Sequence, residues 1–171
     1  MGAFGITYRM RRLADGQQFA VKMIDMDRAR SLGMDANGLV REARLLQQLD
    51  HPHVVQYVAS CNFDDGDVLG IVMELLEGGS LRDKIVSPPP SAEQVATWMR
   101  QVSSGVAHMH SLKMQHRDLK PDNVLFDSEG NAKIIDLGLA SIVGSHASQS
   151  LQQSRVGTPD YMSPEKHRRE K

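Results

Sequence analysis

The sequence contains a single cysteine, Cys61, so no disulfide can form within the chain. A chain without internal disulfides fits a reducing compartment, and we expect an intracellular, cytoplasmic location. Cys61 itself is best interpreted as an inert thiol at the end of a strand. No apolar run reaches the roughly 20 residues that span a bilayer, and no signal peptide is recognisable. The sequence therefore gives no reason to expect a membrane protein.

An excess of charge of either sign is also lacking. The 20 Lys and Arg residues balance 21 Asp and Glu residues, which leaves a net charge of −1. Such a balance gives no argument for binding to nucleic acid or to an acidic membrane surface. The histidines do not show zinc-site spacing: His108 and His110 are two residues apart on a predicted helix and would not face one ligand. The sequence has no internal repeat or long linker, and it does not indicate an oligomeric state.

Polar residues of a particular kind gather in one short stretch. Residues 116–123 read HRDLKPDN, and residues 136–138 read DLG. This stretch contains Asp118, Lys120, Asn123 and Asp136, which can accept a proton, balance phosphate charge and hold a divalent metal. Phosphoryl transfer needs these parts, because the protein contributes mainly positioning and charge stabilisation.

These two motifs resemble the catalytic loop and the metal-binding motif of the eukaryotic protein kinases of serine/threonine type. Further stretches resemble that family in its own order along the chain. They are residues 2–5 (GAFG, glycine-rich loop), 20–23 (AVKM, lysine strand), Glu42 in the next helix, 51–55 (HPHVV), 71–81 (IVMELLEGGSL, last small-lobe strand and hinge) and 157–165 (GTPDYMSPE, end of the activation segment).

The resemblance implies an α+β, bilobal fold. Residues 1–73 would form a small lobe of antiparallel strands plus one helix, with the first strand missing. Residues 74–171 would form the hinge and the first part of a mainly helical large lobe, truncated after the activation segment. The whole chain would then be a partial kinase domain, and we expect the isolated chain to be unstable and nearly inactive.

Local patterns support this placement independently. Asp15-Gly16 is a tight-turn signal between strand-like runs at residues 6–13 and 18–24. In the next helix, Glu42 lies on an apolar stripe with Leu39, Leu46 and Leu49. A buried carboxylate is costly unless it is paired, and Lys22 is the natural partner. The alternative is a glutamate at the helix edge that reaches solvent.

A second helix is predicted after residue 91. Residues 91–94 (SAEQ) form a capping-box pattern. The apolar stripe that follows predicts a long buried helix, and its members are Val95, Trp98, Met99, Val102, Val106 and Met109. The polar stretch at residues 145–154 is typical of a mobile loop.

The resemblance implies a role for each polar residue. Asp118 would be the catalytic base, and Lys120 would neutralise the transferred phosphate. Lys22, paired with Glu42, would hold the α and β phosphates. Asn123 and Asp136 would be the magnesium ligands, since both offer hard oxygen donors. Lys120 and Thr158 match serine/threonine kinases rather than tyrosine kinases.

The resemblance also implies a set of ATP contacts. They are Gly2, Gly5, Ala20, Lys22, Met73, Glu74, Leu76, Ser80 and Leu125. Gly2 and Gly5 would let backbone amides approach phosphate. Met73 would be the gatekeeper, Ala20 and Leu125 would enclose the adenine, and Ser80 would reach the ribose. Besides the residues around the adenine, the resemblance implies a second column of side chains, of the kind that stack on one another in active kinases. Its members would be Leu46, Tyr57, His116 and Leu137.

Regulation is expected at Ser154, where many kinases of this family carry an activating phosphate that pairs with the arginine at the Arg117 position. The alternative is that Ser154 is one of several unmodified serines. Departures from the family pattern are Thr7 in place of valine, Leu137 in place of phenylalanine and Ser163 in place of alanine. Asp122 stays open: it is either a solvated acid or a site for an arginine of the target.

The expected function is ATP-dependent phosphorylation of Ser and Thr in protein substrates, with ATP and Mg²⁺ as cofactors. The alternative is a truncated kinase fragment or pseudokinase that binds nucleotide or a protein partner without turnover. Small-molecule kinases are a weaker possibility, because residues 157–165 match kinases with protein substrates.

Overall fold

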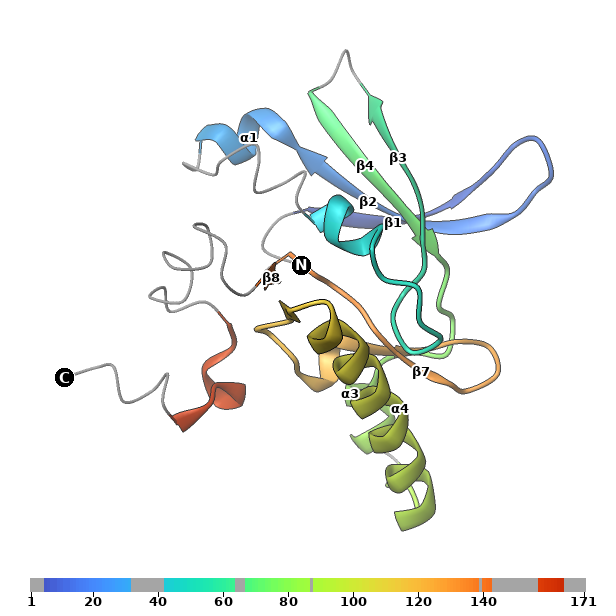
Figure 1. The fold of residues 1–171 in the computed structure, drawn as a ribbon. Helices are drawn as coiled ribbons and strands as arrows, with labels where there is room; N and C mark the ends of the chain where they lie inside the picture. The colour runs from blue at the N-terminus through green and yellow to red at the C-terminus, as the bar shows by residue number, and fades with distance from the viewer. Residues whose placement is uncertain are drawn as a thin grey trace.

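A computed structural model describes residues 5–31, 42–63, 67–86, 88–138, 140–142 and 157–164. An antiparallel sheet forms one part of the described molecule, and the helices α3 (Leu81–Val86) and α4 (Ala92–Ser111) with two short strand pairs form the other (Figure 1). The predicted α+β fold with an antiparallel small lobe is therefore confirmed. Among the described residues, no helix is both long and apolar enough to cross a membrane.

The sheet has the strand order β1-β2-β4-β3, and every neighbouring pair is antiparallel. Its strands are β1 (Ile6–Arg11), β2 (Gln18–Asp25), β3 (Tyr57–Phe63) and β4 (Val68–Glu74). The β1–β2 hairpin turns at Gly16, whose φ of +76° is a conformation that favours glycine. The turn predicted at Asp15-Gly16 is thus confirmed.

β2 lies in the interior of the sheet, and its side chains are buried on both faces. Phe19, Val21, Lys22 and Ile24 are all shielded from solvent. On one side the sheet is covered by the helical residues 42–46, where Leu45 and Leu46 belong to the main apolar core. Helix α1 (Met26–Ser31) follows β2 directly. The polar end of Lys22 is therefore held inside an apolar setting.

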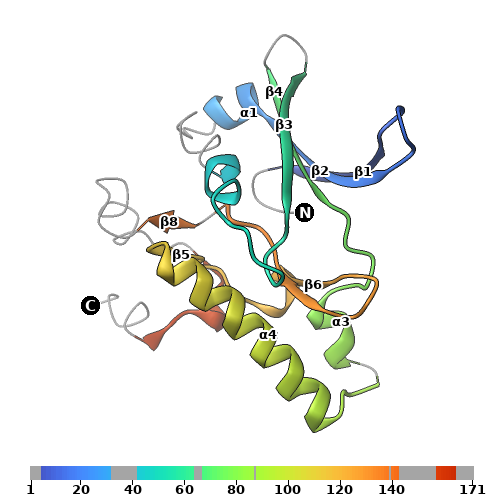
Figure 2. The same ribbon diagram turned by 45° about the vertical axis from the view of Figure 1, so that its right-hand side comes forward.

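The second part of the molecule contains α3 (Leu81–Val86), α4 (Ala92–Ser111) and short pieces that carry the catalytic-loop motif. The short pieces are β5 (Met114–Gln115), η2 (Pro121–Asn123), β6 (Val124–Phe126), β7 (Ala132–Ile134), β8 (Ser141–Ile142) and η3 (Pro159–Tyr161). β5 pairs with β8, and β6 pairs with β7. Figure 2 shows the β6–β7 hairpin beside α3 and α4.

The predicted capping box at the start of α4 is confirmed. The Ser91 side chain accepts a hydrogen bond from the Gln94 amide, and the Gln94 side chain accepts one from the Ser91 amide. Two backbone donors that the helix cannot satisfy itself are thereby bonded. Further along, the Trp98 ring packs edge-on against Phe126, with ring centroids 4.9 Å apart.

The prediction that the whole apolar stripe of α4 is buried is wrong in part. Val102 and Met109 are buried, but Val95 and Met99 are 41% and 54% exposed. Trp98 lies in the same turns of α4 and packs against Phe126 of β6, so Val95 and Met99 lie on a part of the helix surface that this hairpin does not cover. Helical periodicity identifies a face, whereas burial also depends on how far the packing partner reaches along that face.

Candidate active site

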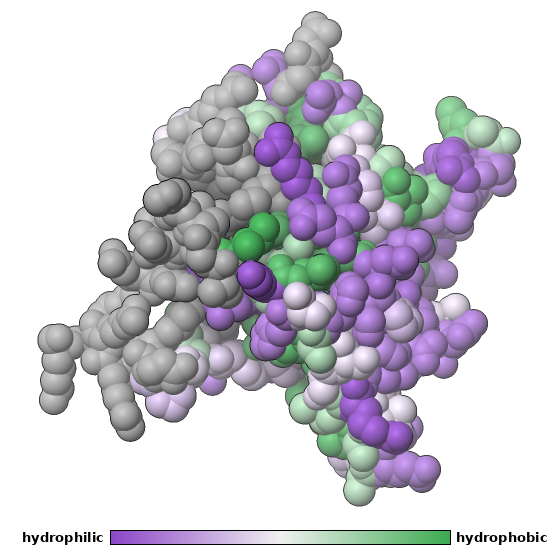
Figure 3. All heavy atoms as spheres, viewed as in Figure 1, coloured by the Kyte–Doolittle hydropathy of each residue, from purple (hydrophilic) through white to green (hydrophobic). Residues whose placement is uncertain are grey.

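A cleft of about 1040 Å³ lies between the sheet and the helical part. On the face shown in Figure 3, apolar side chains gather between these two parts and polar residues border them. The sheet contributes residues of β1, β2 and β4, and the helical part contributes the catalytic-loop motif. Predicted site residues that line the cleft are Gly5, Ala20, Lys22, Glu42, Met73, Glu74, Leu76, Asp118, Lys120, Asn123, Leu125, Asp136 and Thr158.

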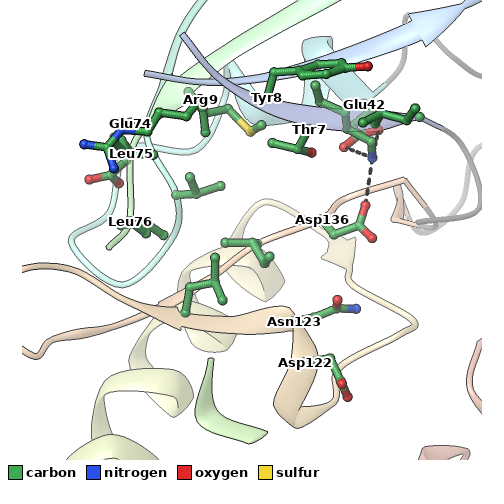
Figure 4. A pocket seen from close by; sticks show the side chains of 18 of the residues that line it. Thr7, Tyr8, Arg9, Glu42, Glu74, Leu75, Leu76, Asp122, Asn123 and Asp136 are labelled. Carbon is green, nitrogen blue, oxygen red and sulfur yellow. Dashed lines mark hydrogen bonds and ion pairs between the residues drawn. The ribbon is translucent and has the colours of Figure 1, made fainter. Parts of the chain in front are cut away.

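On the sheet side, Lys22 is bound by two carboxylates. Its Nζ lies 2.8 and 2.9 Å from the two oxygens of Glu42 and 2.9 Å from Oδ1 of Asp136. In Figure 4, dashed lines join this nitrogen to the labelled Glu42 and to the labelled Asp136. Lys22 and Glu42 are only 7% and 5% exposed. The predicted Lys22–Glu42 pair is confirmed, and the alternative of a solvent-facing Glu42 is wrong.

The charges of this group follow from its surroundings. Burial opposes a charged Lys22, but Glu42 and Asp136 outweigh burial and raise its pKa. Burial likewise opposes a charged Asp136, but the ammonium of Lys22 outweighs it and lowers the pKa of that carboxyl. Lys22 and Asp136 are therefore both ionised at neutral pH, which suits a site for phosphate and metal.

Across the cleft, Asp118 is surrounded by donors. Its Oδ1 accepts hydrogen bonds of 2.7 Å from both the amide and the hydroxyl of Thr158. Its Oδ2 lies 2.8 Å from Nζ of Lys120, which also donates to the Thr158 hydroxyl at 2.8 Å. Burial would raise the pKa of Asp118, but these donors outweigh it and lower the pKa. Asp118 is thus an ionised carboxylate that already accepts a hydrogen bond from a hydroxyl group.

The backbone around Asp118 is fixed by His116. Nε2 of His116 donates to the carbonyl of Ile135 at 2.9 Å, and Nδ1 accepts from the Asp118 amide at 3.3 Å. Burial lowers the pKa of His116, so the ring is neutral and can both donate and accept. Arg117, which lies between His116 and Asp118, has a φ of +72°. Asp136 has a φ of +62°. Such values are uncommon for residues other than glycine, and here they occur beside the predicted catalytic residues.

Asn123 and Asp136 fit the magnesium site that the resemblance implies. The Asn123 amide nitrogen donates to the carbonyl of Asp118 at 2.8 Å and to its Oδ2 at 3.1 Å, so the amide oxygen faces elsewhere. In Asp136, Oδ1 accepts from Lys22, which leaves Oδ2 as a possible ligand. The described residues contain no group of three or more His, Cys, Asp or Glu that could hold a metal. A magnesium ion would therefore take its other ligands from phosphate and water, as this ion commonly does.

The opposite end of the cleft is apolar. Ala20 and Met73 lie directly across from each other in the β2–β4 pair, and Leu125 lies on β6. Leu76 follows β4 and packs against the main core. Ala20 and Leu125 both line the cleft, and the resemblance implies that they enclose the adenine. Gly5 also lines the cleft, where an added Cβ would come within 2.5 Å of the Met23 carbonyl oxygen.

The ribose contact expected of Ser80 stays a prediction; Ser80 forms an isolated β-bridge with Leu125, which lines the cleft. Ser80 itself is not among the cleft-lining residues that the structure describes. Its hydroxyl bonds to the carboxylate of Asp83 and accepts from the Asp83 amide at 3.1 Å. Ser80 therefore directly precedes helix α3 and bonds to its first turn. Of the residues predicted to form the second column, Leu46, Leu137 and Tyr57 share the main core. His116 is buried as well.

Two polar contacts at the hinge were not expected from the sequence. Lys133 lies 2.8 Å from both carboxylate oxygens of Glu74, and the Gln56 amide donates to the same carboxylate at 2.7 Å. Glu74 and Lys133 are 59 residues apart, and no local pattern joins them. The pair fastens the end of β4 to β7. Gly2, Ser154 and Glu165 lie outside the described residues.

A cleft between an antiparallel sheet and a helical part, with a paired lysine on one side and a loop carboxylate on the other, defines the protein kinase class. The sequence comparison agrees: the protein kinase domain family matches residues 1–171. The chain therefore belongs to the protein kinase domain family.

Individual relatives are named as serine/threonine kinases or closely related kinases. The chain is 36% identical to myosin light chain kinase A of Dictyostelium discoideum, covering 96% of this chain and 55% of the relative. It is 36% identical to CBL-interacting serine/threonine-protein kinase 1 of Arabidopsis thaliana, covering 96% and 36%. It is also 36% identical to serine/threonine-protein kinase pkn2 of Myxococcus xanthus, covering 96% and 20%. The chain thus spans between a fifth and about half of these relatives.

Proposed function

We propose that the protein transfers the γ-phosphate of ATP to Ser and Thr hydroxyls of protein substrates. The observation that carries this proposal is that one cleft has Lys22, Asp136 and Asn123 beside Asp118 and Lys120. The first three suit a metal-bound triphosphate. The last two suit a hydroxyl that is to be phosphorylated, since Asp118 already accepts a hydrogen bond from the hydroxyl of Thr158.

Each residue has a task in this proposal. Lys22, held by Glu42, binds the phosphates through its ammonium group. Bound magnesium supplies positive charge that neutralises the phosphate oxygens, with Asn123 and Asp136 as its protein ligands. Asp118 would orient the substrate hydroxyl and accept its proton as the oxygen–phosphorus bond forms, while the bond from the γ-phosphorus to the bridging oxygen breaks and ADP leaves. Because the pKa of Asp118 is lowered, orientation is the larger part of this role.

The preference for Ser and Thr over Tyr is supported by Lys120 and Thr158. Lys120 bridges the Asp118 carboxylate and the Thr158 hydroxyl, so a cation stands beside the reacting hydroxyl. Thr158 in turn fixes Asp118 through two bonds. Loss of Thr158 would therefore leave Asp118 less well oriented.

The test is a phosphorylation assay with magnesium and ATP on matched peptides that differ only in Ser, Thr or Tyr at one position. We expect transfer to Ser and Thr, and not to Tyr. Asp118→Asn should lower turnover by about 10²–10⁴-fold, the usual contribution of a positioned acid–base group. Binding of ATP without transfer to any peptide would instead favour the non-catalytic alternative.

We also propose that phosphorylation of Ser154 activates the protein through Arg117. A phosphate on Ser154 would add nearly two negative charges, which an arginine can bind in bidentate fashion. Arg117 directly precedes Asp118, and its carbonyl lies close to Gly157. Ser154→Ala and Arg117→Ala should both lower activity, and the double variant should be little worse than either. Full activity of Ser154→Ala, with no phosphate found there by mass spectrometry, would contradict this.

A further inference from the structure

Three residues from distant parts of the chain form a connected polar group beside the cleft. Arg82 on α3 donates from Nε to Oδ1 of Asp122 at 2.8 Å. The same guanidinium donates from Nη2 to the hydroxyl of Tyr161 at 3.0 Å. Asp122 lies on η2 and Tyr161 on η3. The group therefore joins the catalytic loop, the segment that follows Thr158 and helix α3.

The position of Arg82 is set by the start of its helix. Ser80 and Asp83 bond to each other in both directions, since the Ser80 amide donates to Asp83 at 2.9 Å and the Asp83 amide donates to Ser80. The hydroxyl and the amide of Ser80 both donate to the Asp83 carboxylate and lower the pKa of that carboxyl. Arg82, next to Asp83 in the helix, pairs instead with Asp122 of the catalytic loop.

Asp122 lies near the carboxylate that would orient the substrate hydroxyl. It lines the same cleft as Asp118 and lies next to Asn123 (Figure 4). Four residues of chain extend at most about 14 Å, so Asp122 lies within that distance of Asp118. A peptide whose hydroxyl bonds to Asp118 would therefore pass Asp122 within about four residues of that hydroxyl.

An uncovered carboxylate at this place would attract a basic side chain of the peptide. Here the carboxylate already has an arginine, and the two side chains are 46% and 45% exposed. A basic residue of the substrate would have to displace Arg82, and Arg82 would lose its bond to Asp122. The bond to Tyr161 further opposes this, because it holds the planar guanidinium in place.

We propose that Arg82 masks Asp122, so that the protein does not select a basic residue near the target hydroxyl, and that the Arg82–Asp122 pair determines this charge preference. The inference rests on the proposed kinase function and specifies its substrate class: Ser and Thr segments without a required flanking Lys or Arg. It also replaces both earlier interpretations of Asp122, as an arginine site for the target and as a merely solvated acid.

The experiment is a positional scan with the protein expressed at full length. Each flanking position of a Ser peptide is occupied in turn by Arg, Asp or Ala, and kcat/KM is measured for each peptide. The wild type should treat Arg and Ala about equally at every position. Arg82→Ala should raise the Arg-to-Ala ratio at one position by about two- to fivefold, as expected for a partly exposed ion pair. Adding Asp122→Asn should remove this gain.

The controls separate masking from other effects. Arg100→Ala removes an exposed arginine on α4 that bonds within its own helix, and it should leave all ratios unchanged. Arg82→Gln tests the same masking with a side chain closer in size to arginine. Tyr161→Phe should give a smaller gain, because Arg82 keeps its bond to Asp122.

The same peptides are also titrated by fluorescence anisotropy, which needs no turnover. If Arg82→Ala bound Arg peptides more tightly relative to Ala peptides than the wild type does, and no protein transferred phosphate, the proposed kinase function would be refuted. The masking of Asp122 by Arg82 would stand. Transfer with unchanged ratios in Arg82→Ala and Arg82→Gln would refute the masking alone. A wild type that already prefers Arg at the position affected by Asp122→Asn would overturn the inference.

Discussion

The buried charges around Lys22 show how single residues set the chemistry of the cleft. A lone ammonium in an apolar core is costly, and so is a lone carboxylate. In this protein Lys22 contacts Glu42 and Asp136 at 2.8 and 2.9 Å, so the charges of Lys22 and Asp136 are compensated. At Glu42, burial outweighs the contact with Lys22 and raises the pKa of the carboxyl. Glu42 is the more deeply buried carboxylate of the two. It fixes the position of Lys22, whereas Asp136 still has an oxygen for a metal.

Glu42→Gln should therefore separate positioning from phosphate chemistry. Glutamine keeps the shape and one acceptor but loses the charge. We expect kcat/KM to fall by about tenfold or more, because the ammonium group of Lys22 would shift toward Asp136 and away from the phosphates. The free energy of unfolding should fall by about 1–3 kcal/mol, the range for a hydrogen bond to a charged group. Steady-state kinetics and urea unfolding measure the two effects.

Glu77→Gln is the matched control for this change. Glu77 pairs with Arg9 at 2.9 Å, but both side chains are more than half exposed. Exposed pairs contribute little to stability. We expect nearly unchanged kinetics and unfolding. If Glu77→Gln were as damaging as Glu42→Gln, burial would not be the cause of the Glu42 effect.

His116 predicts a pH dependence of stability. Burial lowers its pKa below the ordinary value of 6.5, so between these two values the unfolded chain binds more protons than the folded one. Stability is then complete above about pH 6.5 and falls as the pH drops below it. Urea unfolding at pH 7.5 and 5.5 should show a smaller loss for His116→Asn than for the wild type.

His110→Asn provides the comparison, because His110 is an exposed residue in the last turn of α4. This variant should keep the full pH-dependent loss of the wild type. His51 has a lowered pKa as well, caused first by burial and then by His108 and His53. Some pH dependence should therefore remain in His116→Asn. An identical loss in the wild type and in His116→Asn would contradict the account of His116.

Among the elements, α4 is held close to its neighbours by Gly105. A Cβ added there would come within 2.7 Å of the His53 carbonyl oxygen and 3.0 Å of Ile134 Cδ1. Alanine favours helix more than glycine does, by roughly 1 kcal/mol. The clash with fixed backbone should outweigh this gain, and Gly105→Ala should destabilise the protein by about 1–3 kcal/mol.

Ser103→Ala tests whether the effect at Gly105 comes from packing. Ser103 lies in the same helix but is exposed. Substitution there should change the free energy of unfolding by less than about 0.5 kcal/mol. Thermal unfolding of both variants distinguishes the cases. A Gly105→Ala protein as stable as Ser103→Ala would mean that α4 has room to move away from the segment containing His53.

At the scale of the whole molecule, the sequence predicted what is encoded locally or by motif order. The β1–β2 turn, the capping box of α4 and the Lys22–Glu42 pair were all predicted and confirmed. The turn and the cap depend on residues within a few positions of each other. The ion pair could be predicted because Glu42 lies on an apolar stripe and so requires a charged partner. The order of the motifs identified Lys22 as that partner.

What the sequence did not predict depends on contacts between distant residues. The Glu74–Lys133 pair and the Arg82–Asp122–Tyr161 group join elements that no local pattern links. The exposure of Val95 and Met99 has a related cause, because periodicity does not say how far a partner extends. Each of these features depends on how elements that are distant in the sequence lie relative to one another in the folded protein.

The most direct test of the central claim compares ATP binding with phosphoryl transfer in three proteins: the wild type, Asp118→Asn and Asp136→Asn. Single-turnover transfer from γ-labelled ATP to a Ser peptide is measured beside ATP affinity in magnesium. We predict that Asp118→Asn keeps its ATP affinity but loses transfer, because Asp118 acts on the hydroxyl. Asp136→Asn should lose transfer together with magnesium-dependent ATP affinity. Transfer at the wild-type rate in either variant would contradict the assignment of this cleft as a kinase active site.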